Sequence, residues 1–115
     1  MAVSPDQILV VTTENVPGFK VSKVYGEVFG VTTRSRNMFS NMGAGLKSMV
    51  GGEIGAYTKL IEETRGQAMQ RLREAAAATG ANSVVMMRFD TESTAGSMGG
   101  TVAYGTAVVL EPEKK

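Results

Sequence analysis

The sequence contains neither cysteine nor histidine among its 115 residues. Without cysteine, the chain cannot form disulfides, cysteine–zinc sites or thiolate nucleophiles. Without histidine, it lacks the commonest metal ligand and the commonest general acid–base. These absences exclude most metal centres and most catalytic triads, so we expect a protein that is not an enzyme and that carries no cofactor.

The sequence also has no marked excess of positive or negative charge and no long apolar run. Twelve Lys and Arg residues are balanced by 11 Asp and Glu residues, for a net charge of +1, and no basic run is longer than a pair such as Arg34 and Arg36. No run approaches the roughly 20 apolar residues of a membrane span. The first five residues lack the basic flank and apolar stretch of a secretion signal. We therefore expect a cytoplasmic protein without nucleic-acid or membrane partners.

The residues that are present predict one α+β domain over residues 1–115, with an ordered core from about 7 to 111. Runs of β-branched residues predict strands, and turn residues separate the first two. A Ser-, Thr- and Gly-rich loop is predicted at 91–100, and a charged, frayed tail at 111–115. The predicted elements are, in order, strands at 7–13 and 21–33, a helix at 57–79, and strands at 82–90 and 101–110.

The predicted helix is the strongest local signal. Its apolar face follows spacings of three and four, with Arg73 on the outside. Gly80 stands where helices commonly end on a glycine, and Gly66, which weakens a helix, suggests close packing at its turn. The residues of the face are Tyr57, Ile61, Thr64, Ala68, Leu72, Ala75 and Thr79, widened by Leu60, Met69 and Ala76.

Two glycines, Gly26 and Gly30, share one face of the strand predicted at 21–33. Two interpretations are open. The glycines mark a bend or bulge, or they allow another backbone to approach closely.

The layers of this fold predict self-association. A helix of about 24 residues is roughly 36 Å long and covers one face of a small sheet. The strand at 82–90 is apolar on both faces: Val84 and Met86 are expected on one face, and Val85 and Met87 on the other. A sheet exposed on one side normally alternates apolar and polar residues. A second copy of the chain is the simplest cover for the other face; the alternative is that residues 34–55 fold back over it.

Few motifs carry chemistry. Residues 43–48 (GAGLKS) resemble a phosphate-binding loop, but leucine precedes the lysine and the glycine spacing fails, so we expect no nucleotide site. Met38, Met42 and Met49 are the only candidates for a soft-metal cluster, and only if they converge. Arg88, on an otherwise apolar strand, is expected to have a partner, for which Asp90 is one candidate.

Several fragments together resemble the YbjQ-like family from about residue 8 to residue 110. The fragments are residues 44–48 (AGLKS), 50–54 (VGGEI), 57–58 (YT), 63–65 (ETR), 80–82 (GAN), 84–85 (VV), 88–90 (RFD) and 103–108 (AYGTAV). The resemblance implies a dodecin-like or YbjQ-like β-β-α-β-β subunit. It also implies a homopentameric ring in which neighbours complete each other's sheets, sometimes stacked as a decamer.

The resemblance implies no established biochemical activity, although the family often carries the label "putative heavy-metal-binding". Its shared polar residues, Glu53, Tyr57, Arg65, Asn82 and Arg88, are the candidates for binding a ligand. We expect a homo-oligomeric binding or scaffold protein. One alternative is a metal or small-ligand binder with its site at subunit junctions. A hydrolase or transferase is the other, but no nucleophile–base pair supports it.

Overall fold

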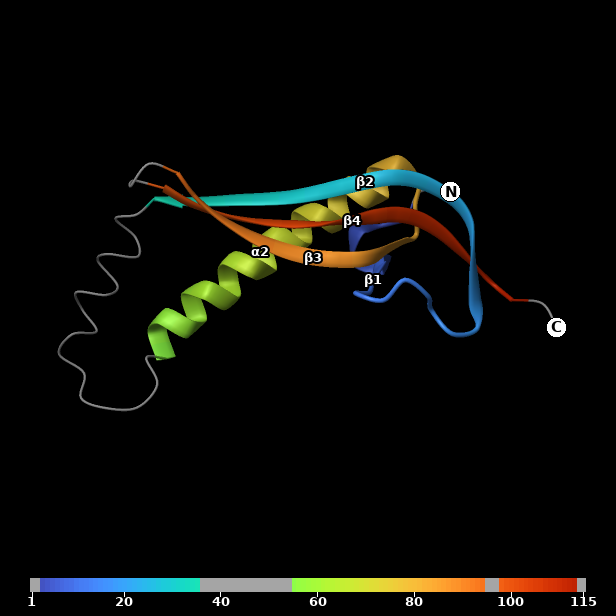
Figure 1. The fold of residues 1–115 in the computed structure, drawn as a ribbon, viewed down its shortest axis with the longest axis horizontal. Helices are drawn as coiled ribbons and strands as arrows, with labels where there is room; N and C mark the ends of the chain where they lie inside the picture. The colour runs from blue at the N-terminus through green and yellow to red at the C-terminus, as the bar shows by residue number, and fades with distance from the viewer. Residues whose placement is uncertain (1–2, 36–54, 95–97, 114–115) are drawn as a thin grey trace.

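The computed structural model of the chain describes residues 3–35, 55–94 and 98–113. Its strands form a mixed sheet in the order β1-β3-β4-β2, with β1 parallel to β3 and the other neighbours antiparallel. The long helix crosses one side of this sheet (Figure 1). The elements are η1 (Pro5–Gln7), β1 (Leu9–Val10), β2 (Phe19–Ser35), α2 (Gly55–Thr79), β3 (Ser83–Thr94) and β4 (Met98–Pro112).

The α+β class and the predicted order of the main elements are confirmed, but several boundaries were wrong. The strand predicted at 7–13 contains only Leu9–Val10, because residues 5–7 form a 3-10 turn. The loop predicted at 91–100 contributes to both β3 and β4, since Thr91 to Thr94 pair with Thr101 to Met98. The tail is not frayed at its start, because Glu111 lies opposite Lys20 in the β4–β2 ladder.

One ladder of helix residues, spaced by four, faces the sheet. Leu60, Thr64, Ala68, Leu72 and Ala76 are all buried. All five belong to the predicted face or its widening, so the core side of α2 was predicted correctly.

Two residues of the helix were placed wrongly. Ile61, predicted to be core, is 41% exposed. Arg73, predicted to lie outside, is half-buried and donates a hydrogen bond from Nη1 to the backbone carbonyl of Ile8. The centre of the face therefore lies on a strict four-residue spacing, which turns Ile61 towards solvent and Arg73 towards the N-terminal segment.

Each interpretation of the strand glycines holds for one of them. Gly26 has a φ of +111° and lies beside a register shift in the β2–β4 ladder, as a bulge requires. A Cβ on Gly30 would lie 2.0 Å from the carbonyl oxygen of Ala68 and 2.4 Å from the amide nitrogen of Leu72. Gly30 therefore lets α2 approach β2 at a distance that no side chain permits.

Gly66 does not mark close packing, contrary to the sequence-based prediction. A Cβ built on it would meet no atom within 4 Å. Because alanine favours the helix by about 1 kcal/mol over glycine, we expect Gly66→Ala to raise the free energy of unfolding by about that amount. Urea unfolding followed by circular dichroism would measure the change. A loss of stability would show that this surface of α2 is occupied.

A bulge in β3 changes the predicted faces of that strand. The ladder with β4 shifts between Val85 and Arg88, and Met86 adopts a left-handed φ of 59°. Val84 is therefore fully buried beside Met87 in the core under α2, and only Met86 is exposed, at 42%. The prediction that Val84 and Met86 share one face was wrong, because a bulge inverts the alternation.

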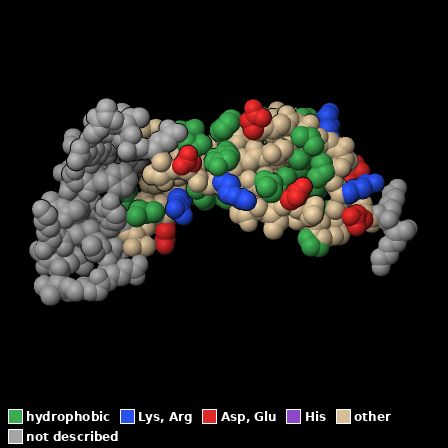
Figure 2. Space-filling model, in the orientation of Figure 1, with side chains coloured by type: hydrophobic (Ala, Val, Ile, Leu, Met, Phe, Trp, Pro, Cys, Tyr) green, Lys and Arg blue, Asp and Glu red, His purple; other side chains and the backbone are tan. Residues whose placement is uncertain are grey.

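The side of the sheet opposite α2 is called the open face below. The only described cover over it is the segment of residues 11–16, whose Val11 and Val16 pack on Val85, Val108 and Leu110. The alternative cover, residues 34–55, lies largely outside the described residues. The strands lie in front of α2 in Figure 1, and hydrophobic side chains gather over them in Figure 2.

Candidate functional site

The open face carries transverse rows of side chains across β3, β4 and β2. Arg88 lies opposite Tyr104, and Tyr104 lies opposite Phe29. In the next row Asp90 lies opposite Val102, and Val102 opposite Val31. Tyr104, Phe29 and Val31 are all exposed large hydrophobic residues. The centre of this face is therefore apolar and aromatic, with charged side chains on its β3 side.

Asn82, one of the candidate ligand-binding residues, has a structural role in the sheet. Its Nδ2 donates to the Leu110 carbonyl at 3.0 Å, and its Oδ1 accepts from the Leu110 amide at 2.8 Å and from Ser83 Oγ at 3.1 Å. Its own carbonyl accepts from the Leu9 amide at 3.2 Å. Asn82 thus ties β1 and β4 to the start of β3, and this role accounts for it without a ligand.

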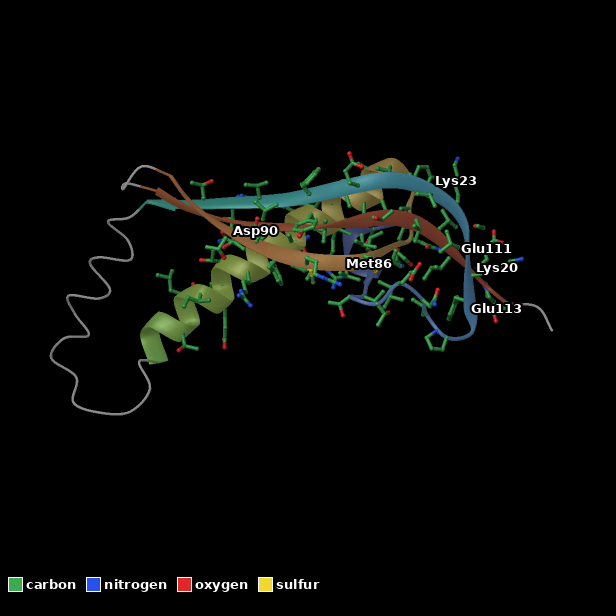
Figure 3. All side chains as sticks on the ribbon, viewed as in Figure 1. Lys20, Lys23, Met86, Asp90, Glu111 and Glu113 are labelled. Atoms are coloured by element: carbon green, nitrogen blue, oxygen red, sulfur yellow. The ribbon has the colours of Figure 1, made fainter. Side chains whose placement is uncertain are left out.

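Arg88 has partners, but Asp90 is not among them. Its Nη1 donates to the carbonyls of Thr12, at 3.0 Å, and Met87, at 2.9 Å. The carboxylate of Asp90 accepts from the Thr91 amide at 3.0 Å. Arg88 therefore has the partners that were expected, but they are two backbone carbonyls rather than the candidate Asp90, and one of them belongs to the N-terminal segment. Figure 3 labels Asp90 and Met86 along β3.

Arg65 lies on the other side of the sheet. Its guanidinium carbon lies 5.2 Å from the centre of the Phe89 ring. Such a cation–π contact at an exposed position is worth about 0.5–1 kcal/mol. Phe89 packs against the core under α2, whereas its neighbour Arg88 is on the open face.

Of the candidate residues, the three whose side chains are described, Arg65, Asn82 and Arg88, do not form one site within a single copy. Arg65 and Arg88 are separated by the sheet, and Asn82 lies six residues before Arg88, about 20 Å along an extended strand. Glu53 lies outside the described residues, as does the side chain of Tyr57. Met38, Met42 and Met49 lie outside them too.

Sequence reasoning missed the row of Arg88, Tyr104 and Phe29. The predicted strand at 101–110 implies by simple alternation that Tyr104 shares a face with Val102 and Thr106, and it does. The match between strands depends on the register of two ladders and on the β3 bulge. No local pattern in the sequence specifies either, so the row could not be predicted.

No group of three or more Asp and Glu residues that could hold a metal ion occurs within residues 3–35, 55–94 and 98–113. Zn²⁺, Ni²⁺ and Cu²⁺ favour imidazole or thiolate ligands, which the chain lacks. We expect none of these ions to bind with a dissociation constant below about 1 µM, equivalent to roughly −8 kcal/mol. Calorimetric titration of each ion at neutral pH would measure this, and tighter binding would contradict the expectation. Cu⁺ is a separate case because of the methionines.

The part of the chain that the structure describes contains no candidate for a membrane-spanning helix. None of its helices is both long enough and apolar enough to cross a bilayer.

Known proteins resemble this chain over nearly all of its length. The YbjQ-like family, whose description reads "Putative heavy-metal-binding", matches residues 8–111. A UPF0145 protein of Lactobacillus johnsonii is 61% identical over 103 residues, which cover 90% of this chain and 94% of that protein. The UPF0145 protein YjfJ of Lactococcus lactis is 55% identical over 106 residues, covering 92% of this chain and 97% of that protein.

A solved structure shares the fold. It is a protein of unknown function from Pediococcus pentosaceus, described as a member of the DUF74 family. The TM-score is 0.58 with 13% sequence identity, and the match covers 90% of this chain and 98% of the other. At this identity the likeness shows the fold alone.

Proposed function

This chain belongs to the YbjQ-like family, and we propose that it is a homo-oligomeric scaffold or binding protein without catalytic activity, built as a homopentameric ring. The cytoplasm is the proposed location, because the composition offers no feature of secreted proteins. The chain has no thiol and no imidazole, and its described candidate residues are either structural or far apart. No nucleophile–base pair is among them.

Apolar exposure along β2 carries the proposal. Val24 is 62% exposed, Phe29 54% and Val31 47%, and all three lie on the open face. Their neighbour Tyr104 is also exposed. Contiguous exposed apolar surface of this kind is uncommon in stable monomers. At about 25 cal/mol per Å², covering roughly 800 Å² of apolar surface per subunit offers on the order of 20 kcal/mol before the costs of association.

The number five comes from the family resemblance, which implies a ring that sometimes stacks as two. A closed assembly is expected on physical grounds as well, because homo-oligomers usually have closed symmetry. A small ligand at the junctions between copies is compatible with the same assembly. Arg65 and Arg88 lie on opposite sides of the sheet, so a site at such a junction would use one of these two arginines together with residues of the neighbouring copy.

Sedimentation velocity at micromolar concentration tests the assembly. With a subunit of 12.1 kDa, we expect one species of about 60 kDa for a ring of five, or about twice that for two stacked rings. A dimer would support the proposal that a second copy covers the open face, and it would contradict the ring. A single species at the monomer mass would refute self-association altogether. Native mass spectrometry of the particle purified from its own cells would show any small ligand retained at the junctions.

A further inference from the structure

A row of three threonines crosses the sheet on the side that faces α2. Thr91 of β3 lies opposite Thr101 of β4, and Thr101 lies opposite Thr32 of β2. Residues directly opposite one another in a ladder share one face of the sheet. This face lies under α2, because the Thr32 hydroxyl donates to Oε1 of Gln67 at 3.1 Å. The ladders therefore bring three hydroxyl groups together beside the helix.

Threonine hydroxyls are buried at this level of the fold. Thr32 is 2% exposed, Thr64 of α2 6% and Thr101 8%. Thr64 donates to the Leu60 carbonyl at 2.8 Å, and Thr32 donates to Gln67. The Thr101 hydroxyl has no hydrogen-bond partner among the described residues. Because buried hydroxyl groups are normally hydrogen-bonded, this one marks a position at which a polar group binds.

Arg65 lies beside the same row, on the β3 side of α2. Its guanidinium carbon is 5.2 Å from the centre of the Phe89 ring. Phe89 precedes Thr91 by two residues, so the two share a face, and it is a diagonal neighbour of Thr101 across the β3–β4 ladder. Diagonal neighbours lie about 7–8 Å apart, within reach of a long side chain. The ring thus holds the guanidinium close to the unpartnered hydroxyl.

Hydrogen-bond donors outnumber acceptors around Thr101. The Arg65 guanidinium and the Gln67 amide nitrogen have no acceptor in the part of the chain that the structure describes. The carboxylate of Asp90 belongs to the open face. Glu62, one turn before Arg65, is exposed and forms no ion pair with it within the described ranges. Guanidinium, amide and hydroxyl donors that lack a carboxylate partner favour an oxyanion as the ligand.

We infer that Arg65, Thr91 and Thr101 bind a small oxyanion, of the phosphate or carboxylate type, between α2 and the β3–β4 ladder. The guanidinium binds the charge, and the Thr101 hydroxyl donates to one oxygen of the anion. Thr91 is exposed, so the ligand enters from the β3 side. Thr32 and Gln67 form the inner wall. This inference rests on the proposed binding role and names the class of ligand.

Calorimetric titration of the full chain with inorganic phosphate, and separately with acetate, tests the site. A Tris-chloride buffer keeps competing oxyanions out. We expect one of the two anions to bind with a dissociation constant of about 1 mM or below. The tighter of the two identifies the ligand as a phosphate or as a carboxylate. Absence of binding by both anions at up to about 10 mM, ten times that constant, would overturn the inference.

Two substitutions locate the bound anion. Thr101→Val removes the hydroxyl and keeps the shape of the side chain, and Arg65→Gln removes the charge. Each is expected to weaken binding about tenfold, as the loss of one hydrogen bond to a charged group does. Their matched controls are Thr106→Val, on the open face of the same strand, and Lys59→Gln, on the exposed side of α2. Binding that Thr101→Val leaves unchanged would overturn the site.

Thermal unfolding separates loss of the ligand from loss of the fold. In buffer without oxyanions, Thr101→Val is expected to unfold at the same temperature as the unmodified protein or higher, because valine removes a buried hydroxyl that has no partner. Adding the anion is expected to raise the unfolding temperature of the unmodified protein and not that of the variant. An equal rise in both would contradict the inference. Sedimentation velocity reports on assembly independently, so a monomer that binds the anion would refute the ring alone.

Discussion

Gly30→Ala is expected to lower the free energy of unfolding by about 3 kcal/mol or more. The added methyl group would lie 2.0 Å from the Ala68 carbonyl oxygen and 2.4 Å from the Leu72 amide nitrogen. Both atoms belong to the backbone of α2, so no side-chain rotation relieves the clash. The helix must move away from β2, and the loss exceeds the usual cost of overpacking for one methyl group.

Comparing the urea unfolding of Gly30→Ala with that of Gly66→Ala separates the effect of packing on stability from the effect of backbone conformational entropy. The two substitutions add the same atom, but the site at Gly66 is open within 4 Å. We expect them to change stability in opposite directions. Equal stabilisation by both would mean that α2 does not approach β2 as closely as the structure shows.

Leu72→Ala is expected to cost about 2–5 kcal/mol of unfolding free energy. Leu72 is fully buried and is among the largest fully buried side chains of the described residues. It packs in the cluster that also holds Val28 and Val84, from β2 and β3. Removing its side chain leaves a cavity between the helix and the sheet, which the rigid neighbours fill only in part.

Glu74→Ala is the suitable control for Leu72→Ala, because Glu74 is exposed on the same turn of α2. We expect this change to stay within about 0.5 kcal/mol. Arg73→Ala is not an appropriate control, since Arg73 hydrogen-bonds the Ile8 carbonyl. Thermal and chemical unfolding at several protein concentrations would separate loss of the core from loss of assembly. Comparable losses for Leu72→Ala and Glu74→Ala would mean that the helix is rotated.

The candidate site shows where sequence reasoning reached its limit. Asn82, Arg65 and Arg88 were proposed together because the family shares them, yet each has a separate local role. The sequence shows that each of these side chains is polar and belongs to a motif shared with the family, but it does not show what the side chain contacts. Asn82 contacts Leu110, 28 positions away, and Arg88 contacts Thr12, 76 positions away. Contacts so distant in sequence leave no periodic signal.

The sequence by itself determined the chemistry that this protein lacks, the order of its main elements and the buried side of its helix. Composition is independent of folding, and a helix face repeats over many residues, so both can be read locally. Only the tertiary structure decided which strand residues face solvent. Bulges near Gly26 and at Met86 exchange the two faces of β2 and β3. Because side chains alternate with every residue along a strand, one extra residue reverses all that follow, and long-range pairing determines where it is inserted.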